Sequence, residues 1–289
     1  MNIIFHIDGG MGKCVVATAI CEVIKRQYPD AQLIVVCGYP DVFINNPWVD
    51  KCYGFGEQKY FFENYVHGQD VKIHAHNPYL EAKHIKREEH LLKTWSTMFG
   101  YNYNGEYPQI YLTNREKEYL SQKFVSDKPI MVLQTNGGAP NQETKYSWAR
   151  DIPQHVAQKV VNHYKDQYNI VHIRREDQPA LEFTTPISDN FRSMCVLLMM
   201  SERRLLIDSF AQHVCAALHL PSTVCWIVNS EGCFGYDLHE NIRANEFTRK
   251  PDLRNSYLDA FSITGNPMEF PYNSELEIFN ADEIIESLK

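Results

Sequence analysis

The sequence has 289 residues, of which 44% are hydrophobic and 22% charged, and its formal net charge is −8. These proportions are typical of a globular protein, and the acidic balance argues against indiscriminate binding to nucleic acid. No apolar run is long enough to span a bilayer and no basic, apolar leader is present, so we expect a cytoplasmic protein without a transmembrane segment.

The N-terminal half alternates between strand and helix patterns. The apolar residues 1–7 predict a strand, residues 8–13 a glycine turn, and residues 14–28 an amphipathic helix that ends at Pro29. Further strands are expected at 32–37, 50–55, 71–76 and 109–112, a short helical turn at 41–44, and helices at 86–99 and 114–124, the last capped by Thr113 or Asn114.

The same alternation begins again after the polar, proline-ended segment 125–129. Strands are expected at 130–134, 169–173, 204–207 and 223–228, and helices at 152–165, 191–200, 210–218 and 281–288. The predicted fold is α/β, with two facing doubly wound, Rossmann-like parallel sheets. We expect an N-terminal domain of residues 1–127, a C-terminal domain of residues 128–265, and a tail of residues 266–289 that packs back across the domains.

Eight cysteines are scattered along the chain without a Cys-x-x-Cys pair. Several of them fall inside helix or strand patterns as small core residues. This usage favours a reducing compartment and argues against structural disulfides and zinc.

Two segments predict phosphate-binding turns at helix N-termini. Asp208 and Ser209 follow a buried strand, and His213 lies one helical turn later, which suits a diphosphate or a nucleotide. The alternative is an Asp N-cap with a packed histidine. At the other end of the chain, Gly9, Gly10 and Gly12 allow a ligand to approach the backbone closely.

The N-terminal turn is also similar to a P-loop, because Lys13 follows Gly12. The full P-loop pattern requires a glycine where Ile7 stands and a Ser or Thr where Cys14 stands, so the hydroxyl that coordinates magnesium is missing. A P-loop nucleotidase therefore stays a minor alternative.

Six segments, in order, resemble those of glycosyltransferase family nine, the heptosyltransferase-like enzymes of GT-B fold. The segments are 9–12 with 17–19, 28–31, 46–50, 107–113, 135–139 with 145–148, and 208–213. The resemblance implies that the C-terminal domain binds a nucleotide sugar and the N-terminal domain binds the acceptor. It assigns Thr135, Asn136 and Lys145 to the phosphates, and it places Asp208, Ser209 and His213 around the phosphate and the sugar.

The chain departs from this family where the catalytic base is expected. An acidic residue usually follows the glycine loop, but Lys13 stands there, and its ammonium would need strong desolvation before it could accept a proton. We therefore expect Asp8, the nearest carboxylate, to be the base, and Lys13 to serve the leaving diphosphate or an anionic acceptor. The alternative is that Asp8 only caps the turn.

Phe210 also stands where the family has a glycine. Arg174 and Arg175 replace the expected glycine-rich turn, and they could clamp a phosphate or form a solvated turn.

On the acceptor side, His74 and His76 are expected on one side of a strand, which could suggest a metal. Because no third ligand follows at a suitable spacing, we expect no metal site. Lys86, His90 and Lys93 would share a helix face that suits an anionic acceptor, such as a phosphorylated glycan or a nucleic-acid strand. The alternative is an ordinary solvated helix face.

Together these features predict an inverting, metal-independent glycosyltransferase that moves a sugar from a nucleotide-diphosphate donor to a hydroxyl acceptor, with no cofactor besides the donor. A cell-surface oligosaccharide is the expected acceptor, by analogy with the family. Hydroxymethylated bases of phage DNA are an alternative acceptor for the same chemistry. A P-loop-like nucleotidase and a catalytically inactive nucleotide-binding module are the alternatives from other classes.

Overall fold

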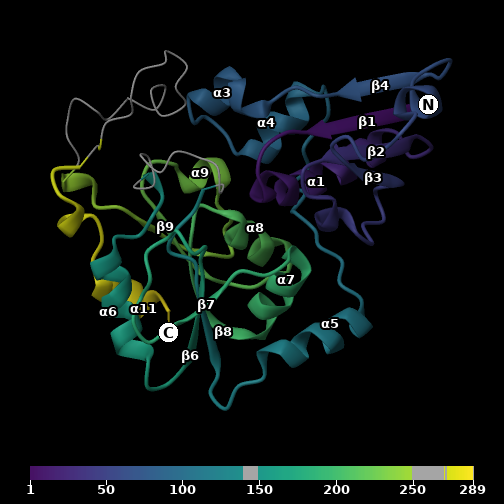
Figure 1. Ribbon diagram of the computed structural model, residues 1–289. Coiled ribbons are helices and arrows are strands. Elements are labelled where there is room, and N and C mark those ends of the chain that lie inside the picture. Colours follow the sequence, from purple (N-terminus) through teal and green to yellow (C-terminus); the bar gives the residue numbers. More distant parts are fainter. Residues whose placement is uncertain (139–148, 249–269, 271, 289) are drawn as a thin grey trace.

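The computed structural model describes residues 1–138, 149–248, 270 and 272–288. It contains two separate sheets, with strand orders β3-β2-β1-β4 and β10-β9-β8-β5-β6-β7. All strand pairs are parallel. The predicted α/β fold with two parallel sheets is therefore confirmed. We call the part built on the first sheet the N-terminal lobe and the part built on the second the C-terminal lobe (Figure 1).

The N-terminal lobe has one well-covered sheet face. Its strands are β1 (Asn2–Ile7), β2 (Gln32–Cys37), β3 (Lys51–Gly54) and β4 (Val71–His74). Its helices are α1 (Met11–Gln27), α2 (Phe61–Tyr65), α3 (Ala82–Ile85) and α4 (Leu91–Met98), with 3-10 turns η1 (Pro40–Phe43) and η2 (Pro78–Leu80). Alternate residues of β1, including Ile3 and Phe5, are buried under α1 and α4, and Phe5 meets Trp95 edge-on with ring centres 5.5 Å apart.

The single helix expected at 86–99 is wrong, because the chain turns sharply between α3 and α4. Arg87 adopts a left-handed conformation with φ of 58°, and the Glu88 N–H donates to the Lys83 carbonyl at 2.9 Å. The ring of His90 then accepts the N–H of Leu92 and caps α4. Lys86 lies at the end of α3 and His90 at the start of α4, so these two residues do not share one helix face.

The strand expected at 109–112 is also absent from the described structure, where residues 101–113 are irregular. Its backbone is held by side chains of α1, because the Gln109 N–H donates to the Thr18 hydroxyl at 2.8 Å. Helix α5 (Asn114–Ser121) follows with the expected cap, since Thr113 and Glu116 form a capping box. It continues into η3 (Gln122–Phe124) and packs on α7 of the C-terminal lobe.

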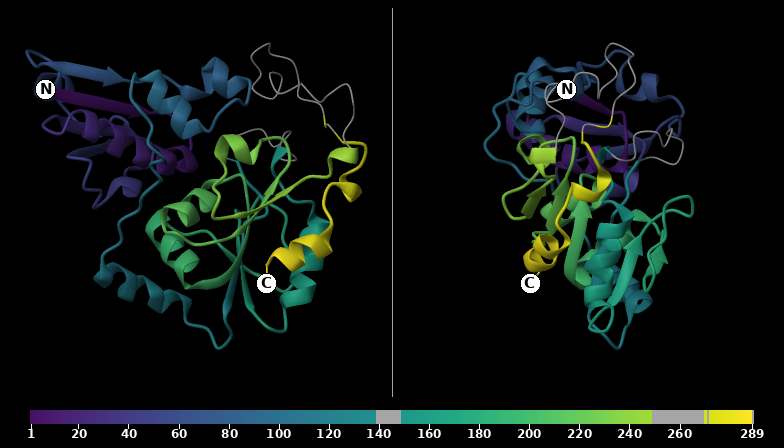
Figure 2. Two further views of the ribbon diagram at one scale, coloured as in Figure 1. Left: turned by 180° about the vertical axis from the view of Figure 1, so that it is seen from behind. Right: turned by 90° about the vertical axis from the view of Figure 1, so that its left-hand side faces the viewer.

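The C-terminal lobe carries helices on both faces of its sheet (Figure 2). Its strands are β5 (Ile130–Leu133), β6 (Asn169–Ile173), β7 (Thr185–Ile187), β8 (Ser201–Ile207), β9 (Thr223–Trp226) and β10 (Glu240–Arg243). Its helices are α6 (Gln154–Tyr164), α7 (Phe191–Met200), α8 (Phe210–Ala217), α9 (Glu231–Phe234) and α11 (Ala281–Ser287), with 3-10 turns η5 (Glu246–Thr248) and η7 (Glu275–Glu277). The edge strands β7 and β10 were not expected from the sequence.

The described part of the tail lies on the C-terminal lobe. Helix α11 packs on α6, and the Tyr164 hydroxyl donates to the Ile285 carbonyl at 3.0 Å. The yellow helix in Figure 2 shows this position, away from the N-terminal lobe. In this part of the chain the tail does not cross back between the lobes.

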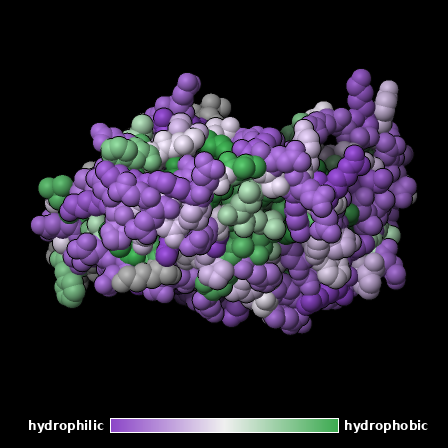
Figure 3. All heavy atoms as spheres, turned by 90° about the horizontal axis from the view of Figure 1, so that it is seen from below, coloured by the Kyte–Doolittle hydropathy of each residue, from purple (hydrophilic) through white to green (hydrophobic). Residues whose placement is uncertain are grey.

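The two lobes meet where α1 packs on α8, and one apolar core extends from the first sheet through these helices to α7. Seen from below the view of Figure 1, the surface is mostly hydrophilic, with apolar residues gathered in a band near its middle (Figure 3). No helix in the described ranges is both long and apolar enough to cross a membrane.

Candidate active site in the cleft between the lobes

A cleft of about 620 Å³ lies between the lobes, within the size range of small-molecule sites. The strands of both sheets point toward it (Figure 1), so the residues that follow the strands form its walls. Asp8 follows β1, Gln134 follows β5, Arg174 follows β6 and Asp208 follows β8. This is the edge at which parallel sheets usually bind ligands.

The N-terminal wall carries an acid paired with a buried lysine. The Lys13 ammonium lies 2.5 Å from Oδ1 of Asp8 and 3.0 Å from the side-chain oxygen of Asn77. It also lies 4.8 Å from the centre of the Tyr79 ring. The Lys13 side chain is 4% exposed, whereas that of Asp8 is 54% exposed and faces the cleft. Lys13 therefore holds a carboxylate that a ligand can reach.

The glycine turn brings the lobes into close contact. Gly9 has φ of 100°, a conformation that favours glycine. A Cβ atom on Gly12 would lie 3.2 Å from Cδ2 of His213 and 3.4 Å from Cα of Phe210. Gly12 therefore lets the N-terminus of α1 approach the N-terminus of α8.

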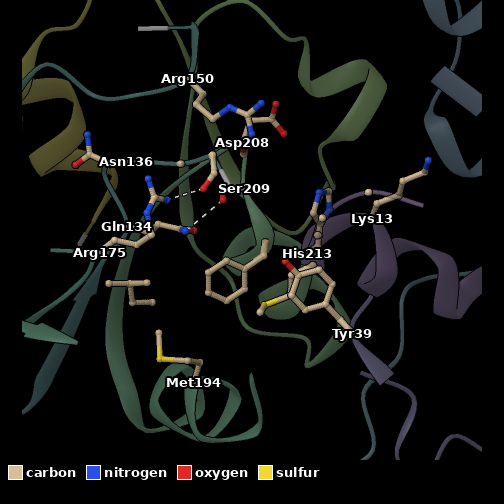
Figure 4. Close-up of a pocket in the computed structure, with 18 of the residues that line it drawn as sticks. Lys13, Tyr39, Gln134, Asn136, Arg150, Arg175, Met194, Asp208, Ser209 and His213 are labelled. Carbon is tan, nitrogen blue, oxygen red and sulfur yellow. Dashed lines mark hydrogen bonds between the residues drawn. The ribbon is translucent and has the colours of Figure 1, made fainter. Parts of the chain in front are cut away.

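The C-terminal wall is built around the first turn of α8. Ser209 is the N-cap residue, and its hydroxyl accepts a hydrogen bond from the Gln134 amide at 3.2 Å, as Figure 4 shows. The Gln134 oxygen accepts the N–H of Ala211 at 3.4 Å. The buried carboxylate of Asp208 accepts a hydrogen bond from Asn229, and burial raises its pKa above the ordinary value. Asp208 and Ser209 thus lie together in the cleft.

His213 also lines the cleft, one turn further along α8. Its Nδ1 lies 2.9 Å from the Tyr236 hydroxyl. Burial, followed by the neighbouring His90 and His239, lowers the pKa of His213 to about 3. The imidazole is therefore neutral at pH 7 and can donate or accept only through uncharged nitrogen atoms.

Two residues that were assigned to the phosphates, Thr135 and Asn136, lie side by side in the loop after β5 but in different environments. Thr135 is buried, and its hydroxyl lies 2.8 Å from Nε2 of His172, inside the lobe. Asn136 lines the cleft, and its amide donates to Asp151 at 3.0 Å. The structure therefore brings Asn136, but not the Thr135 side chain, to the cleft. Lys145 lies outside the described residues.

Three arginines, Arg150, Arg174 and Arg175, line the same wall. Nη1 of Arg150 lies 3.5 Å from the Asp208 carbonyl oxygen. Arg174 donates to backbone carbonyls of its own turn, and Arg175 donates to the Gly138 carbonyl at 2.6 Å. Arg174 and Arg175 had been noted as possible phosphate clamps, whereas no sequence signal marked Arg150. Figure 4 shows Lys13 and Arg175 on opposite sides of the cleft.

The residues expected on the acceptor side lie elsewhere. His74 is buried, with Nε2 2.6 Å from the Tyr101 hydroxyl, and burial lowers its pKa to about 4. His76 is exposed beyond the end of β4, so it does not share a strand face with His74. Lys86 is exposed 3.8 Å from Glu88, and the ring of His90 contacts the Gly235 carbonyl at 3.0 Å. None of the four is among the residues that line the cleft.

Comparison with solved structures identifies the fold. A glycosyl transferase of family 9 from Veillonella parvula superposes with a TM-score of 0.65 at 13% identity, over 99% of this chain and 95% of that one. The E. coli ADP-heptose LPS heptosyltransferase II gives a TM-score of 0.59 at 14% identity, over 92% and 99%. The E. coli heptosyltransferase WaaC with ADP gives 0.57 at 11% identity, over 92% and 100%.

No protein-family model matches the sequence, and no curated protein matches it significantly. The similarity is therefore one of structure, and it covers nearly the whole chain. The chain has the two-lobed GT-B fold of these glycosyltransferases, and the resemblance expected from its motifs is confirmed at the level of the fold.

Proposed function

We propose that the protein is an inverting glycosyltransferase that moves a sugar from a nucleotide-diphosphate donor to a hydroxyl acceptor. The observation that carries this proposal is that an accessible carboxylate and several guanidinium groups line opposite walls of the cleft. An accessible carboxylate, Asp8, lies on the N-terminal wall, while Arg150, Arg174 and Arg175 line the C-terminal wall. Glycosyl transfer needs both, because a hydroxyl loses a proton while a diphosphate departs with negative charge.

The donor belongs on the C-terminal wall in this proposal. Guanidinium groups bind phosphate oxygens through parallel N–H donors, and the N-terminus of α8 adds backbone N–H groups and a partial positive charge. Two of the solved structures with the same fold are E. coli WaaC with ADP and with ADP-2-deoxy-2-fluoro heptose. An ADP-activated heptose is therefore the first donor to test.

The chemistry is a single displacement. The acceptor oxygen forms a bond to the anomeric carbon from the face opposite the diphosphate, the bond between that carbon and the diphosphate oxygen breaks, and the hydroxyl proton passes to Asp8. Lys13 and Asn77 fix the carboxylate, since the ammonium bridges the two side chains. The reaction inverts the anomeric configuration and, in this scheme, requires no metal and no further cofactor.

Two alternatives receive less support. A P-loop nucleotidase needs a lysine that reaches phosphate oxygens, whereas the Lys13 ammonium is buried against Asp8, Asn77 and Tyr79. The alternative of modified DNA as the acceptor drew on a basic helix face, but Lys86 and His90 belong to different elements. A cell-surface oligosaccharide remains the acceptor class we propose, by analogy with the fold.

Thermal unfolding in the presence of nucleotide sugars tests the proposal. A donor that binds only the native protein at 100 times its Kd stabilises it by about 2.7 kcal/mol. We expect ADP-heptose or another nucleotide-diphosphate sugar to raise Tm by several degrees, and Arg150→Ala to reduce this shift at the same ligand concentration. If no nucleotide sugar raises Tm, or if Arg150→Ala leaves the shift unchanged, the assignment of the donor wall is wrong.

A further inference from the structure

The ring of His213 is held from the side that faces away from the cleft. Its Nδ1 lies 2.9 Å from the Tyr236 hydroxyl. Among the described residues, His213 lines the cleft and Tyr236 does not, and Figure 4 draws His213 with the other lining residues. Cδ2 of His213, the ring atom bonded to Nε2, faces Gly12 of the glycine turn, where an added Cβ would lie 3.2 Å from it. The Nε2 edge of the ring therefore faces the glycine turn and the cleft.

The burial of Tyr236 decides which atom of this contact donates. Tyr236 is 5% exposed, and the described part of the chain gives its hydroxyl one hydrogen-bond partner, Nδ1 of His213. If Nδ1 carried a proton and donated it, the hydroxyl proton would be buried without an acceptor among the described residues. Buried polar groups are rarely left in that state, because the lost hydration is not replaced. Tyr236 therefore donates to Nδ1.

The neighbouring amide favours the same arrangement. The Gln212 amide nitrogen donates to the Phe234 carbonyl at 3.1 Å, which fixes the orientation of the amide, because a carbonyl only accepts. The same nitrogen lies 3.1 Å from Nδ1 of His213 and 3.3 Å from Nε2. An amide nitrogen only donates, so the closer ring atom, Nδ1, is favoured as an acceptor. A neutral imidazole with an unprotonated Nδ1 carries its proton on Nε2.

Aromatic rings from both halves of the chain hold Tyr236 in place. The centre of its ring lies 5.4 Å from that of Tyr107 and 5.6 Å from that of His90. The ring of His239 lies on another side, with centres 5.9 Å apart. Since interiors are close-packed, a ring enclosed in this way keeps its hydroxyl directed at His213.

We propose that Tyr236 is a positioning residue, whose hydroxyl holds Nδ1 of His213 as an acceptor so that His213 presents an uncharged Nε2–H donor to a phosphate oxygen in the cleft. The inference rests on the proposed function, which takes the ligand beside α8 to be a nucleotide-diphosphate sugar. Ionised phosphate oxygens only accept hydrogen bonds. The other tautomer would turn a lone pair toward them. Tyr236 thus acts through His213 and does not itself contact the ligand.

NMR of the whole protein labelled with ¹⁵N-histidine tests the inference without any ligand. The protonated and the unprotonated nitrogen of a neutral imidazole give distinct ¹⁵N signals, and His213→Gln identifies the signals of His213 among those of the 12 histidines. We expect His213 of the wild type to carry its proton on Nε2 at pH 7. Tyr236→Phe keeps the ring contacts but removes the hydroxyl, so it should give a mixture of the two tautomers.

The matched control is Tyr164→Phe. Tyr164 is also buried, and its hydroxyl donates to the Ile285 carbonyl at 3.0 Å, on the far side of the C-terminal sheet from α8. This variant loses one buried hydrogen bond, as Tyr236→Phe does, but it should leave the His213 signals unchanged. A change of tautomer in both variants would mean that loosened packing, and not the Tyr236 hydroxyl, moves the proton.

Calorimetric titration with ADP gives a second measurement. We expect Tyr236→Phe to bind ADP about tenfold more weakly than the wild type, the worth of one hydrogen bond, and Tyr164→Phe to bind it within twofold. A wild-type His213 protonated on Nδ1, or a tautomer that is the same in Tyr236→Phe, would overturn the inference. If the wild type keeps its nucleotide-sugar Tm shift while the tautomer test fails, only the inference falls. If the wild type binds neither ADP nor a nucleotide sugar, the proposed function falls, and the NMR signals still decide the role of Tyr236.

Discussion

Gly12 offers a sharp test of how the lobes are packed. A Cβ atom there would lie 3.2 Å from Cδ2 of His213 and 3.4 Å from Cα of Phe210. Ordinary carbon contacts are about 3.5 to 4.0 Å, so even a methyl group requires α1 and α8 to move apart by a few tenths of an ångström. Gly12→Val adds two further methyl groups at the same place.

The cost follows from the overpacking of well-packed interiors, about 1 to 3 kcal/mol. The better helix propensity of valine relative to glycine offsets a few tenths of this. Gly10→Val is the control for added volume, because a Cβ on Gly10 meets no atom of the described structure within 4 Å. Gly10 is the N-cap of α1, where valine is disfavoured, so the control itself should lose up to about 1 kcal/mol. We therefore expect Gly12→Val to be about 1 kcal/mol less stable than Gly10→Val, and its Tm to be about 2 to 4 °C lower.

Urea denaturation followed by circular dichroism measures this difference. Gly12→Ala should fall between the wild type and Gly12→Val. If Gly12→Val and Gly10→Val unfold at the same urea concentration, the close approach of α1 to α8 is not a feature of the folded protein, and the cleft geometry argued above loses its basis.

Three further outcomes are expected. Lys13→Met, which removes the ammonium beside Asp8, should lower kcat at least tenfold and leave donor affinity within about threefold; steady-state kinetics and calorimetry together would reject a positioning role if kcat were unchanged. Arg150→Ala should weaken donor binding about tenfold to a hundredfold, the worth of a hydrogen bond to a charged group, whereas unchanged affinity would remove Arg150 from the site. The free energy of unfolding should decrease as the pH is lowered from about 6.5 to about 4, because buried histidines bind protons only after unfolding. Each such histidine reduces it by up to about 1.4 kcal/mol per pH unit. A free energy of unfolding that stays constant across this window would contradict the prediction. The histidines whose pKa is lowered to about 4 by burial are His74, His84, His172 and His239.

The local sequence pattern predicted helices and strands best where a regular apolar period ends at polar or turn-forming residues. The apolar run at 32–37 matches β2, and the segment 191–200 matches α7, because in both the periodic apolar residues end at polar or turn-forming neighbours. Asp8, Asp208 and Ser209 were predicted as site residues, and each follows a strand, at the end where parallel sheets usually bind ligands. The structure places all three there.

Features that depend on contacts between residues far apart in the sequence were not predicted. The break at Arg87 has no glycine or proline to announce it, and the His90 ring that caps α4 also contacts Gly235 from the other lobe. Gln134 was predicted only as the last residue of a strand, yet its side chain forms hydrogen bonds with the first turn of α8, at Ser209 and Ala211. Arg150 carries no local signal, since its position beside Asp208 arises only when two separate segments meet.

The most direct test of the whole account replaces Asp8 by asparagine, which can still accept a hydrogen bond from Lys13 but cannot take up the proton of a hydroxyl. The measurement is glycosyl transfer from the nucleotide sugar that stabilises the wild type to an acceptor that the wild type glycosylates, alongside donor affinity by calorimetry. The account predicts at least a hundredfold loss of transfer in Asp8→Asn with donor affinity within about threefold of wild type. Transfer at the wild-type rate in this variant would contradict it.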